Sequence, residues 1–301
     1  MGLCLCVRFD QQSDFMMSAY LTPLENYLPP EMIINILSYV DAKTLVNLRL
    51  VSHSWKHFID NEVWKLKTSR EKYRSLKSVD PKRKLPWFVY YLICVKDPFE
   101  KNLLKNHCGQ EKLTHWDIIS SGGDRWVVED PPQGAEKLPE SEEFGKLTSC
   151  FATSYHSCSK EQTIDLSSIG FGSKIMDELQ PLIEVSEWYA GRFDCGCIYE
   201  MHAVLLNAER KPLHKFERRE TVNQWEGRDW YKVSHTFQNY GPGVRFIQFF
   251  HGGMDTQFWA GHYGSKMSGA CVKIVIPAEV SRGSSCESES ESEEHCVTAL
   301  P

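Results

Sequence analysis

Two large aromatic residues stand side by side in a short segment with glycines on both sides, and this arrangement suits the binding of a sugar. The segment 257–263 contains Phe258 and Trp259 and lies between the last two stretches predicted to be strands. Two adjacent large aromatics in a turn cannot both point into a core, so at least one should face outward. A pyranose offers an apolar C–H face that stacks on an aromatic ring, and its hydroxyls need fixed donors and acceptors. We therefore expect Trp259 to act as a stacking platform.

Enzymatic chemistry near the same segment would need groups that the sequence does not bring together. Glycoside hydrolysis requires a pair of carboxylates across the bond, and Asp194 and Asp255 are the only acids that we place near the loops, neither with an obvious partner. A nucleophile such as Cys195, with His235 as its base, would need a third group to orient the base. One residue separates Cys195 from Cys197, whereas zinc sites usually have two between close ligands. We expect a non-catalytic protein without cofactor or metal.

Length and composition indicate a globular intracellular protein of more than one part. The chain has 301 residues, of which 42% are hydrophobic and 12% aromatic, and this suits a small helical module plus a domain of about 200 residues. The eleven cysteines are scattered and no signal peptide precedes them, which indicates reduced thiols in the cytoplasm. No stretch approaches the roughly 20 apolar residues of a membrane span.

Residues 87–277 have the pattern of an antiparallel β-sandwich. Short apolar runs alternate with Gly, Pro and Asn signals, which favours strands joined by turns over a helical or βαβ domain. In one such run Tyr199, Met201, Ala203 and Leu205 share one face. We predict strands near residues 163–166, 182–188, 197–206, 213–216, 230–237, 244–251 and 270–276.

Residues 28–64 predict three short helices and a final turn. Pro29 and Pro30 suit a helix start, Asp41 and Ser52 can cap the second and third helices, and Asn61 is predicted to open a last turn. The unit carries more large apolar side chains than three short helices can hide. We therefore expect it to dock on a partner.

The order Leu28-Pro29, apolar helix, Arg49-x-Val51-Ser52-x-x-Trp55 and Trp64 resembles an F-box. The resemblance implies docking on an Skp-family adaptor, which bridges to the cullin and RING subunits of an SCF ubiquitin ligase. The adaptor-binding residues that it implies are Leu28, Pro29, Ile33, Ile36, Leu37, Leu48, Val51 and Trp55.

Six blocks of the second domain are similar to the F-box-associated (FBA) domain of the sugar-recognising F-box only proteins. They are residues 101–106, 122–126, 187–192, 234–237, 240–246 and 251–256. The resemblance implies a galactose-binding-like sandwich whose end loops bind the chitobiose core of high-mannose N-glycans. It further implies that misfolded or cytosol-exposed glycoproteins are ubiquitinated and degraded, as in endoplasmic-reticulum-associated degradation.

The same resemblance implies four glycan-binding residues, namely the pair Phe258 and Trp259, the acidic acceptor Asp194 and the pocket aromatic Tyr155. Asp194 could instead be a turn residue bonded to its own backbone, and Phe151 fits a pocket or a core equally well. Some relatives have a lysine where Ala260 stands. The alternative hypothesis is therefore an F-box receptor whose sandwich reads a protein surface and has lost glycan binding.

Together these features predict an α+β multidomain chain. Residues 1–22 form a disordered N-terminus with a possible lipidation site at Gly2, Cys4 and Cys6, which would give peripheral membrane attachment. An F-box at 23–66, a charged linker at 67–86, the FBA sandwich at 87–277 and an acidic disordered tail at 278–301 follow. The basic stretch 65–84 lacks stacking aromatics, which favours a solvated helix over a nucleic-acid site. We expect a cytoplasmic protein with N-glycosylated clients.

Overall fold

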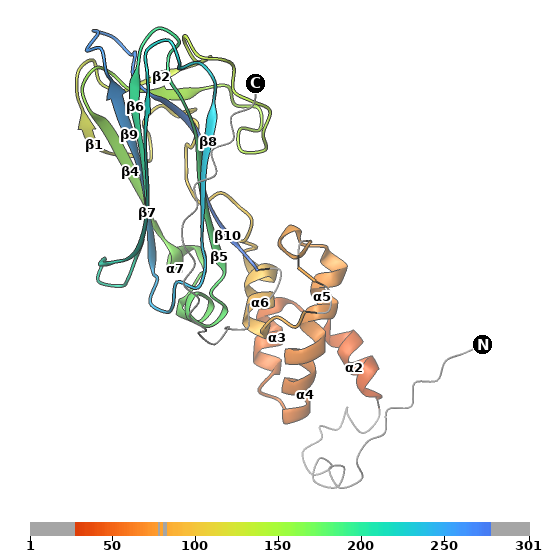
Figure 1. Ribbon diagram of the computed structural model, residues 1–301. Coiled ribbons are helices and arrows are strands. Elements are labelled where there is room, and N and C mark those ends of the chain that lie inside the picture. The colour runs from red at the N-terminus through yellow and green to blue at the C-terminus, as the bar shows by residue number, and fades with distance from the viewer. Residues whose placement is uncertain (1–27, 78, 81–82, 278–301) are drawn as a thin grey trace, which may run out of the picture.

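The computed structural model describes residues 28–77, 79–80 and 83–277, in a helical part followed by a β-sandwich (Figure 1). The predicted lipidation residues Gly2, Cys4 and Cys6 and the predicted tail 278–301 lie outside the described residues. Within the part of the chain that the structure describes, no helix is long and apolar enough to cross a membrane.

The helical part follows the predicted caps. The Asp41 carboxylate accepts hydrogen bonds from the backbone N–H groups of Lys43 and Thr44, and the Ser52 hydroxyl accepts one from Trp55. Both caps satisfy N–H groups that have no partner inside a helix, so these two helix starts are confirmed. The helices are α2 (Pro30–Leu37), α3 (Ala42–Leu48), α4 (His53–Phe58), the π-helical turn η2 (Ile59–Val63), α5 (Trp64–Glu71) and the 3₁₀ turn η3 (Arg74–Leu76).

The prediction that Asn61 opens a separate turn is wrong. Elements α4, η2 and α5 run on without a break from His53 to Glu71. The Asn61 amide donates to the backbone oxygen of His57, 2.9 Å away, inside the helix. Its side chain therefore follows the helix instead of capping a new one.

Helix α6 (Trp87–Val95) joins the helical part to the sandwich. The prediction that the sandwich starts at residue 87 misses this helix, which contacts α3 and α5. The Arg49 guanidinium forms a two-pronged ion pair with Asp60 at 2.6 and 3.0 Å and stacks over Trp87 at 3.7 Å. One arginine thus ties α3, η2 and α6 together. The domain boundaries themselves stay a prediction.

The sandwich consists of two five-stranded sheets, and all their neighbouring strands are antiparallel, as predicted. The first sheet has the order β1 (Asp117–Ser121), β4 (Cys158–Asp165), β9 (Phe246–Asp255), β6 (Cys197–Leu206), β7 (Pro212–Val222). The second has the order β2 (Val127–Glu129), β3 (Cys150–Ala152), β10 (Lys266–Val275), β5 (Leu182–Ala190), β8 (Tyr231–Phe237). Two short elements, α7 (Leu166–Ile169) and η4 (Ile175–Leu179), follow β4.

All seven predicted strands are present, and β6 has the predicted bounds. Three strands were missed. Strands β2 and β3 have three residues each, and β1 has no alternation of buried and exposed residues, so none carries the period-2 signal.

The core lies between the sheets. Tyr199, Met201, Ala203 and Leu205 of β6 are fully buried, which confirms their predicted shared face. Tyr199 stacks on Tyr189 of β5 with ring centroids 4.4 Å apart. Stacked rings of this kind fix the spacing of the two sheets.

The two ends of the sandwich have different neighbours. At one end, Glu100 N–H donates to the backbone oxygen of Ile274, and the Lys96 amine to that of Ser168, next to α6. The other end, here called the loop end, carries the loops 153–157, 191–196, 223–230 and 256–265. Figure 1 shows the loop end far from the helical part. A site on these loops is therefore separated from the helical part by the length of the strands.

Candidate functional site

The four predicted glycan-binding residues all lie at the loop end. Tyr155 follows β3, Asp194 lies between β5 and β6, and Phe258 and Trp259 lie between β9 and β10. Their roles as ligand contacts stay a prediction. The contacts among them and their neighbours define what the site can do.

The aromatic pair is held outward by a buried carboxylate. Asp255 is fully buried and accepts hydrogen bonds from the backbone N–H groups of Gln257, at 3.0 Å, and Phe258, at 2.6 Å. Phe258 has a φ of 57°, a conformation that costs free energy for a residue with a side chain. The side chains of Phe258 and Trp259 are 64% and 40% exposed. The expectation that at least one faces outward is confirmed for both.

A second set of contacts clamps the far side of this loop. The Asp124 carboxylate accepts from Gly261 N–H at 2.6 Å, and the Ser154 hydroxyl donates to the Gly261 oxygen at 2.7 Å. Ser154 also accepts from Asp124 N–H at 2.9 Å. The loop is therefore fixed at both of its ends, which preorganises the exposed rings.

Asp194 reaches Trp259 through two intermediates. Its Oδ1 accepts from Arg192 Nε at 2.7 Å, and the Arg192 guanidinium lies 4.5 Å from the centre of the Tyr263 ring. Tyr263 in turn meets Trp259 edge to face, with centroids 5.6 Å apart. The carboxylate thus pairs with the Arg192 side chain of the same turn, whereas the alternative expected a bond to the backbone of that turn. Within the described residues this bond uses Oδ1, so Oδ2 can accept from a ligand hydroxyl.

Tyr155 belongs to a separate row of rings. Its ring centroid lies 5.0 Å from that of His156, which lies 6.1 Å from that of Phe258. Tyr155 is half-buried, whereas Phe151 is fully buried and packs against Trp116 in the core. Phe151 is therefore a core residue, and Tyr155 is the aromatic that neighbours the exposed pair.

The sequence analysis missed the connecting residues Asp124, His156, Arg192 and Tyr263. Arg192 and Asp194 are two residues apart and of opposite charge, so the sequence could have predicted their ion pair. Asp124 meets Gly261, His156 meets Phe258 and Tyr263 meets Arg192 across long stretches of chain, and nothing local predicts those contacts. Tyr263 also meets Trp259, which is only four residues away.

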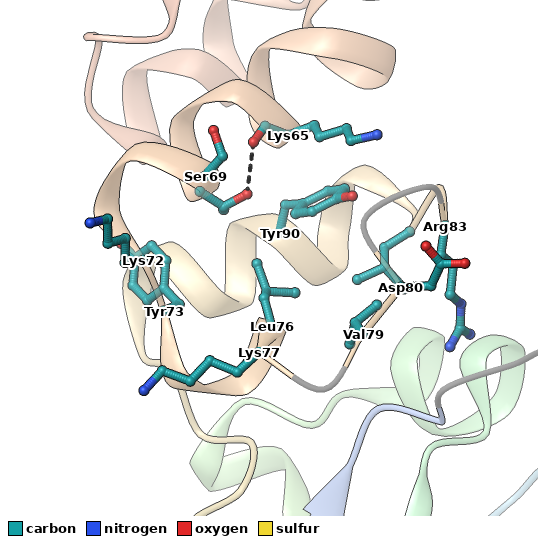
Figure 2. A pocket seen from close by; sticks show the side chains of 12 residues that line it. Lys65, Ser69, Lys72, Tyr73, Leu76, Lys77, Val79, Asp80, Arg83 and Tyr90 are labelled. Carbon is teal, nitrogen blue, oxygen red and sulfur yellow. Dashed lines mark hydrogen bonds between the residues drawn. The ribbon is translucent and has the colours of Figure 1, made fainter.

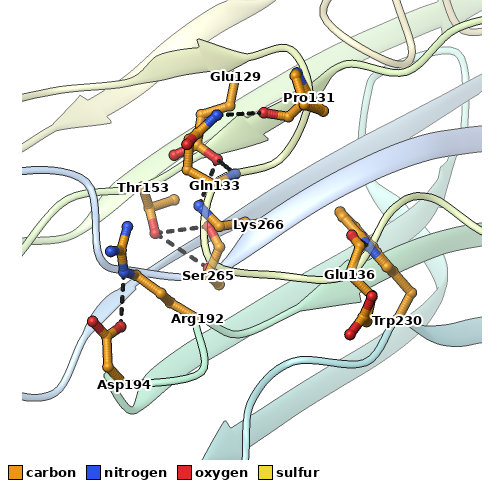
Figure 3. A network of polar contacts seen from close by, with 10 residues as sticks. All are labelled: Glu129, Pro131, Gln133, Glu136, Thr153, Arg192, Asp194, Trp230, Ser265 and Lys266. Atoms are coloured by element: carbon orange, nitrogen blue, oxygen red, sulfur yellow. Dashed lines mark hydrogen bonds and ion pairs between the residues drawn. The ribbon is translucent and has the colours of Figure 1, made fainter.

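A polar network lies behind the loop end (Figure 3). The fully buried Lys266 pairs with Glu129 at 2.6 Å, and Glu129 also accepts from Gln133 N–H at 2.6 Å. The Thr153 hydroxyl donates to the backbone oxygen of Ser265 at 3.1 Å. These bonds tie the segment after β2 to the strands under the candidate site.

The loop end lacks the geometry of the enzymatic alternatives. Cys195 is buried, and burial raises the pKa of its thiol to about 11, which disfavours a thiolate nucleophile. His235 stacks on Phe216 with centroids 4.3 Å apart. Asp255 binds the loop backbone. Among the described residues no group of three or more His, Cys, Asp and Glu side chains could hold a metal ion.

A well-formed cavity of about 400 Å³ lies elsewhere, between α5, η3 and α6 (Figure 2). Its lining includes Leu76, Val79 and Tyr90, with Lys65 and Lys72 at its edge. It is remote from the loop end and contains none of the predicted glycan-binding residues. Because a sugar stacks on a flat exposed ring, the open loop end is the better candidate for a sugar site than this cavity.

The predicted adaptor-binding residues differ in exposure: some lie on the surface of the helical part and others are buried in its core. Ile36 and Val51 are 50% and 49% exposed, whereas Ile33 and Leu37 are buried in the helical core. Pro29 is exposed, and Leu28, Leu48 and Trp55 are partly buried. Three exposed apolar residues that were not predicted, Met32, Tyr39 and Leu50, lie in the same helices and turns. Ile33 and Leu37 therefore shape the unit from within, and the exposed apolar residues are the ones that can meet a partner.

The fold and the site define a class of protein in which a small helical docking unit precedes a β-sandwich with a rigid aromatic end. The F-box-like family matches residues 26–68, and the family described as F-box associated region matches residues 94–274. The chain thus belongs to the F-box-associated (FBA) family of F-box only proteins. Such proteins are substrate adaptors of SCF ubiquitin ligases and are generally non-catalytic.

Several curated relatives are similar over most of their length. F-box only protein 6 of Rattus norvegicus is 38% identical over 83% of this chain and 86% of its own. F-box only protein 44 of Homo sapiens is 36% identical over 84% of this chain and 97% of its own. F-box only protein 2 of Bos taurus is 35% identical over 82% of both chains.

Proposed function

We propose that this chain recognises N-linked high-mannose glycans through their chitobiose core and presents the glycoproteins that carry them to an SCF ubiquitin ligase. The clients are misfolded or cytosol-exposed glycoproteins, and the chain acts in the cytoplasm. The proposal rests above all on the exposure of Phe258 and Trp259 on a loop that Asp255, Asp124 and Ser154 hold in place.

The chemistry of the loop end supports a sugar ligand. Trp259 offers a flat apolar ring for the C–H face of a pyranose, and Asp194 lies near it, linked through Arg192 and Tyr263. Tyr155 and Phe258 add apolar surface that an N-acetyl methyl group can contact. A carbohydrate needs this mixture of apolar face and fixed polar group.

The adaptor half of the proposal rests on the helical part. Its exposed apolar side chains Ile36, Leu50 and Val51 have no cover within the described residues, and such patches mark protein interaction sites. The partner is an Skp-family adaptor that carries the cullin and RING subunits. Peripheral membrane attachment through Gly2, Cys4 and Cys6 is part of the same proposal, and acyl labelling of the chain with and without Gly2→Ala tests it.

A binding experiment with the full chain in complex with its adaptor tests the sugar site. We expect wild-type chain to bind chitobiose-containing glycans, and Trp259→Ala to weaken this binding about tenfold or more, as expected when a central aromatic contact is removed. The matched control is Leu213→Ala, because Leu213 is also 40% exposed but lies at the start of β7, away from the loop end.

Treatment of a client with an endoglycosidase separates this proposal from its alternative. If the client still binds after its glycans are removed, and Trp259→Ala changes nothing, the sandwich reads a protein surface and the sugar proposal is wrong. Turnover of a chitobiose-containing glycopeptide by the purified chain would contradict a non-catalytic role.

A further inference from the structure

Two more aromatic side chains at the loop end have no role in the site described so far. Phe193 is 47% exposed and Trp225 is 70% exposed. Trp225 also has a φ of 72°, a backbone conformation that is a genuine outlier for a bulky residue. Neither burial nor local backbone preference accounts for an indole held outward in this way.

The side chain next to Trp225 in the sequence is bonded to the turn that carries Asp194. The Gln224 side-chain amide donates to the backbone oxygen of Asp194 at 3.1 Å. Gly227 and Gly191 are in such close contact that a Cβ added at Gly227 would lie 3.0 Å from the Gly191 Cα. The loops 191–196 and 223–230 therefore form one body, and Asp194 lies within it.

Local bonds fix the turn that presents Trp225. Glu226 N–H donates to the backbone oxygen of Asn223 at 3.2 Å, and the Asn223 amide donates to the Glu226 carboxylate at 2.8 Å. These two bonds span Trp225 and close the turn around it. The indole is therefore displayed from a defined backbone.

A third segment braces both loops. Phe193 N–H donates to the backbone oxygen of Gly134 at 2.9 Å, and Glu136 N–H donates to that of Arg228 at 2.9 Å. The Trp230 indole donates to the backbone oxygen of Glu136 at 2.8 Å (Figure 3). A backbone held this firmly loses little freedom when a ligand binds, which favours affinity.

We propose that Phe193 and Trp225 form a second stacking surface, which takes sugar rings of the same glycan that lie beyond the inner disaccharide. The inference rests on the proposed function, because it extends that site past Asp194. Carbohydrate fits this surface because the exposed Trp225 ring stands among polar side chains that hydrogen bonds hold in place, namely Asn223, Gln224 and Glu226. Trp259 likewise has hydrogen-bonded side chains near it, namely Arg192 and Asp194.

The experiment compares two ligands on the full chain in complex with its adaptor. The ligands are the disaccharide chitobiose and a free high-mannose glycan that contains it. We expect Trp225→Ala to leave chitobiose affinity unchanged and to weaken the larger glycan about fivefold, the effect of one lost stacking contact. Phe193→Ala should act in the same direction. Trp259→Ala should weaken both ligands.

The outcomes separate this inference from the function on which it rests. If Trp225→Ala leaves both ligands unchanged, or weakens both equally, the second surface does not exist as proposed. An intact glycoprotein serves as a third ligand: if Trp225→Ala weakens its binding and not that of the free glycan, Trp225 contacts polypeptide, and the inference is again wrong. If Trp259→Ala has no effect on either ligand, the proposed function itself fails. Leu213→Ala and the melting temperature of each variant control for misfolding, and Trp225→Ala should melt like wild type because the side chain is exposed.

Discussion

At the scale of single residues, the most unusual feature is a group of ionisable side chains in the buried centre of the sandwich. Glu187 is fully buried, accepts a hydrogen bond from the Tyr199 hydroxyl at 2.7 Å and lies 2.5 Å from His251 Nδ1. Lys160 is also fully buried, with its amine 3.4 Å from the centre of the Phe151 ring. Burial raises the pKa of Glu187 to about 8 and holds the pKa of Lys160 well below its usual range. Both groups therefore favour their neutral forms.

Substitution of Glu187 by glutamine should change how stability depends on pH. A carboxyl group whose pKa is raised by folding contributes its full stability below its unfolded pKa of about 4.3, and this contribution is lost as the pH rises toward about 8. Glu187→Gln removes this titration. The free energy of unfolding of wild type, minus that of the variant, should fall over this window by roughly 1 kcal/mol per pH unit. Urea denaturation of both proteins at several pH values between 4.5 and 8 measures this difference in the free energy of unfolding.

Glu184→Gln is the matched control, because Glu184 lies on the same strand but is exposed. The free energy of unfolding of Glu184→Gln, plotted against pH, should run parallel to that of wild type. If the difference in the free energy of unfolding between wild type and Glu187→Gln stays constant over this pH range, Glu187 is ionised in the folded chain.

At the scale of elements, the loop after β9 owes its shape to Asp255. Its buried carboxylate accepts from the backbone N–H groups of Gln257 and Phe258, just where Phe258 adopts a positive φ. Burial raises the pKa of this carboxyl group. The aromatic pair is therefore positioned by a side chain that is itself buried.

Asp255→Ala should lower both stability and glycan affinity. Loss of the acceptor leaves two N–H groups without a partner, which costs about 1–2 kcal/mol, and the loop no longer fixes Trp259. Denaturant unfolding and glycan binding by the same preparation measure the two effects.

Asp165→Ala provides the comparison. Asp165 caps α7 by accepting from Ser167 and Ser168 N–H, so its loss removes bonds of the same kind at the opposite end of the sandwich. It should lower stability and leave glycan affinity unchanged. Equal loss of glycan binding in both variants would show that stability alone, and not loop shape, is responsible.

At the scale of the whole molecule, the two proposed interfaces lie at opposite ends. The helical part contacts the sandwich through α6 and the backbone near Ile274, and the loop end lies beyond the strands (Figure 1). This separation leaves room for a large ligase at one end and a glycoprotein at the other. The two binding events should therefore be separable by mutation.

Ile36→Glu should abolish co-purification with the Skp-family adaptor and leave glycan binding intact. Ile36 is 50% exposed, so a charge there costs the fold little but opposes an apolar interface. Trp259→Ala should do the reverse. Adaptor pull-down and glycan binding of both variants test this, and an Ile36→Glu chain that still recovers the adaptor would show that this surface is not the docking site.

The sequence by itself determined what depends on near neighbours in the chain. The caps at Asp41 and Ser52, the alternation along β6 and the outward position of the Phe258–Trp259 pair follow from residues only a few positions apart. A hydrogen bond to an N–H three residues on, or the period of a strand, needs no knowledge of the rest of the fold. The antiparallel sandwich followed from the same local patterns together with the family resemblance.

Only the tertiary structure decided how distant residues meet. Asp124 bonds to Gly261 and Glu187 to His251 because β1, β4 and β9 are neighbours in one sheet and β5 faces them in the other. The same topology brings Trp225 to the turn of Asp194 and buries α6 between the two parts. Such contacts depend on which strands lie side by side, and that order arises from packing the whole core, which no short stretch of sequence records.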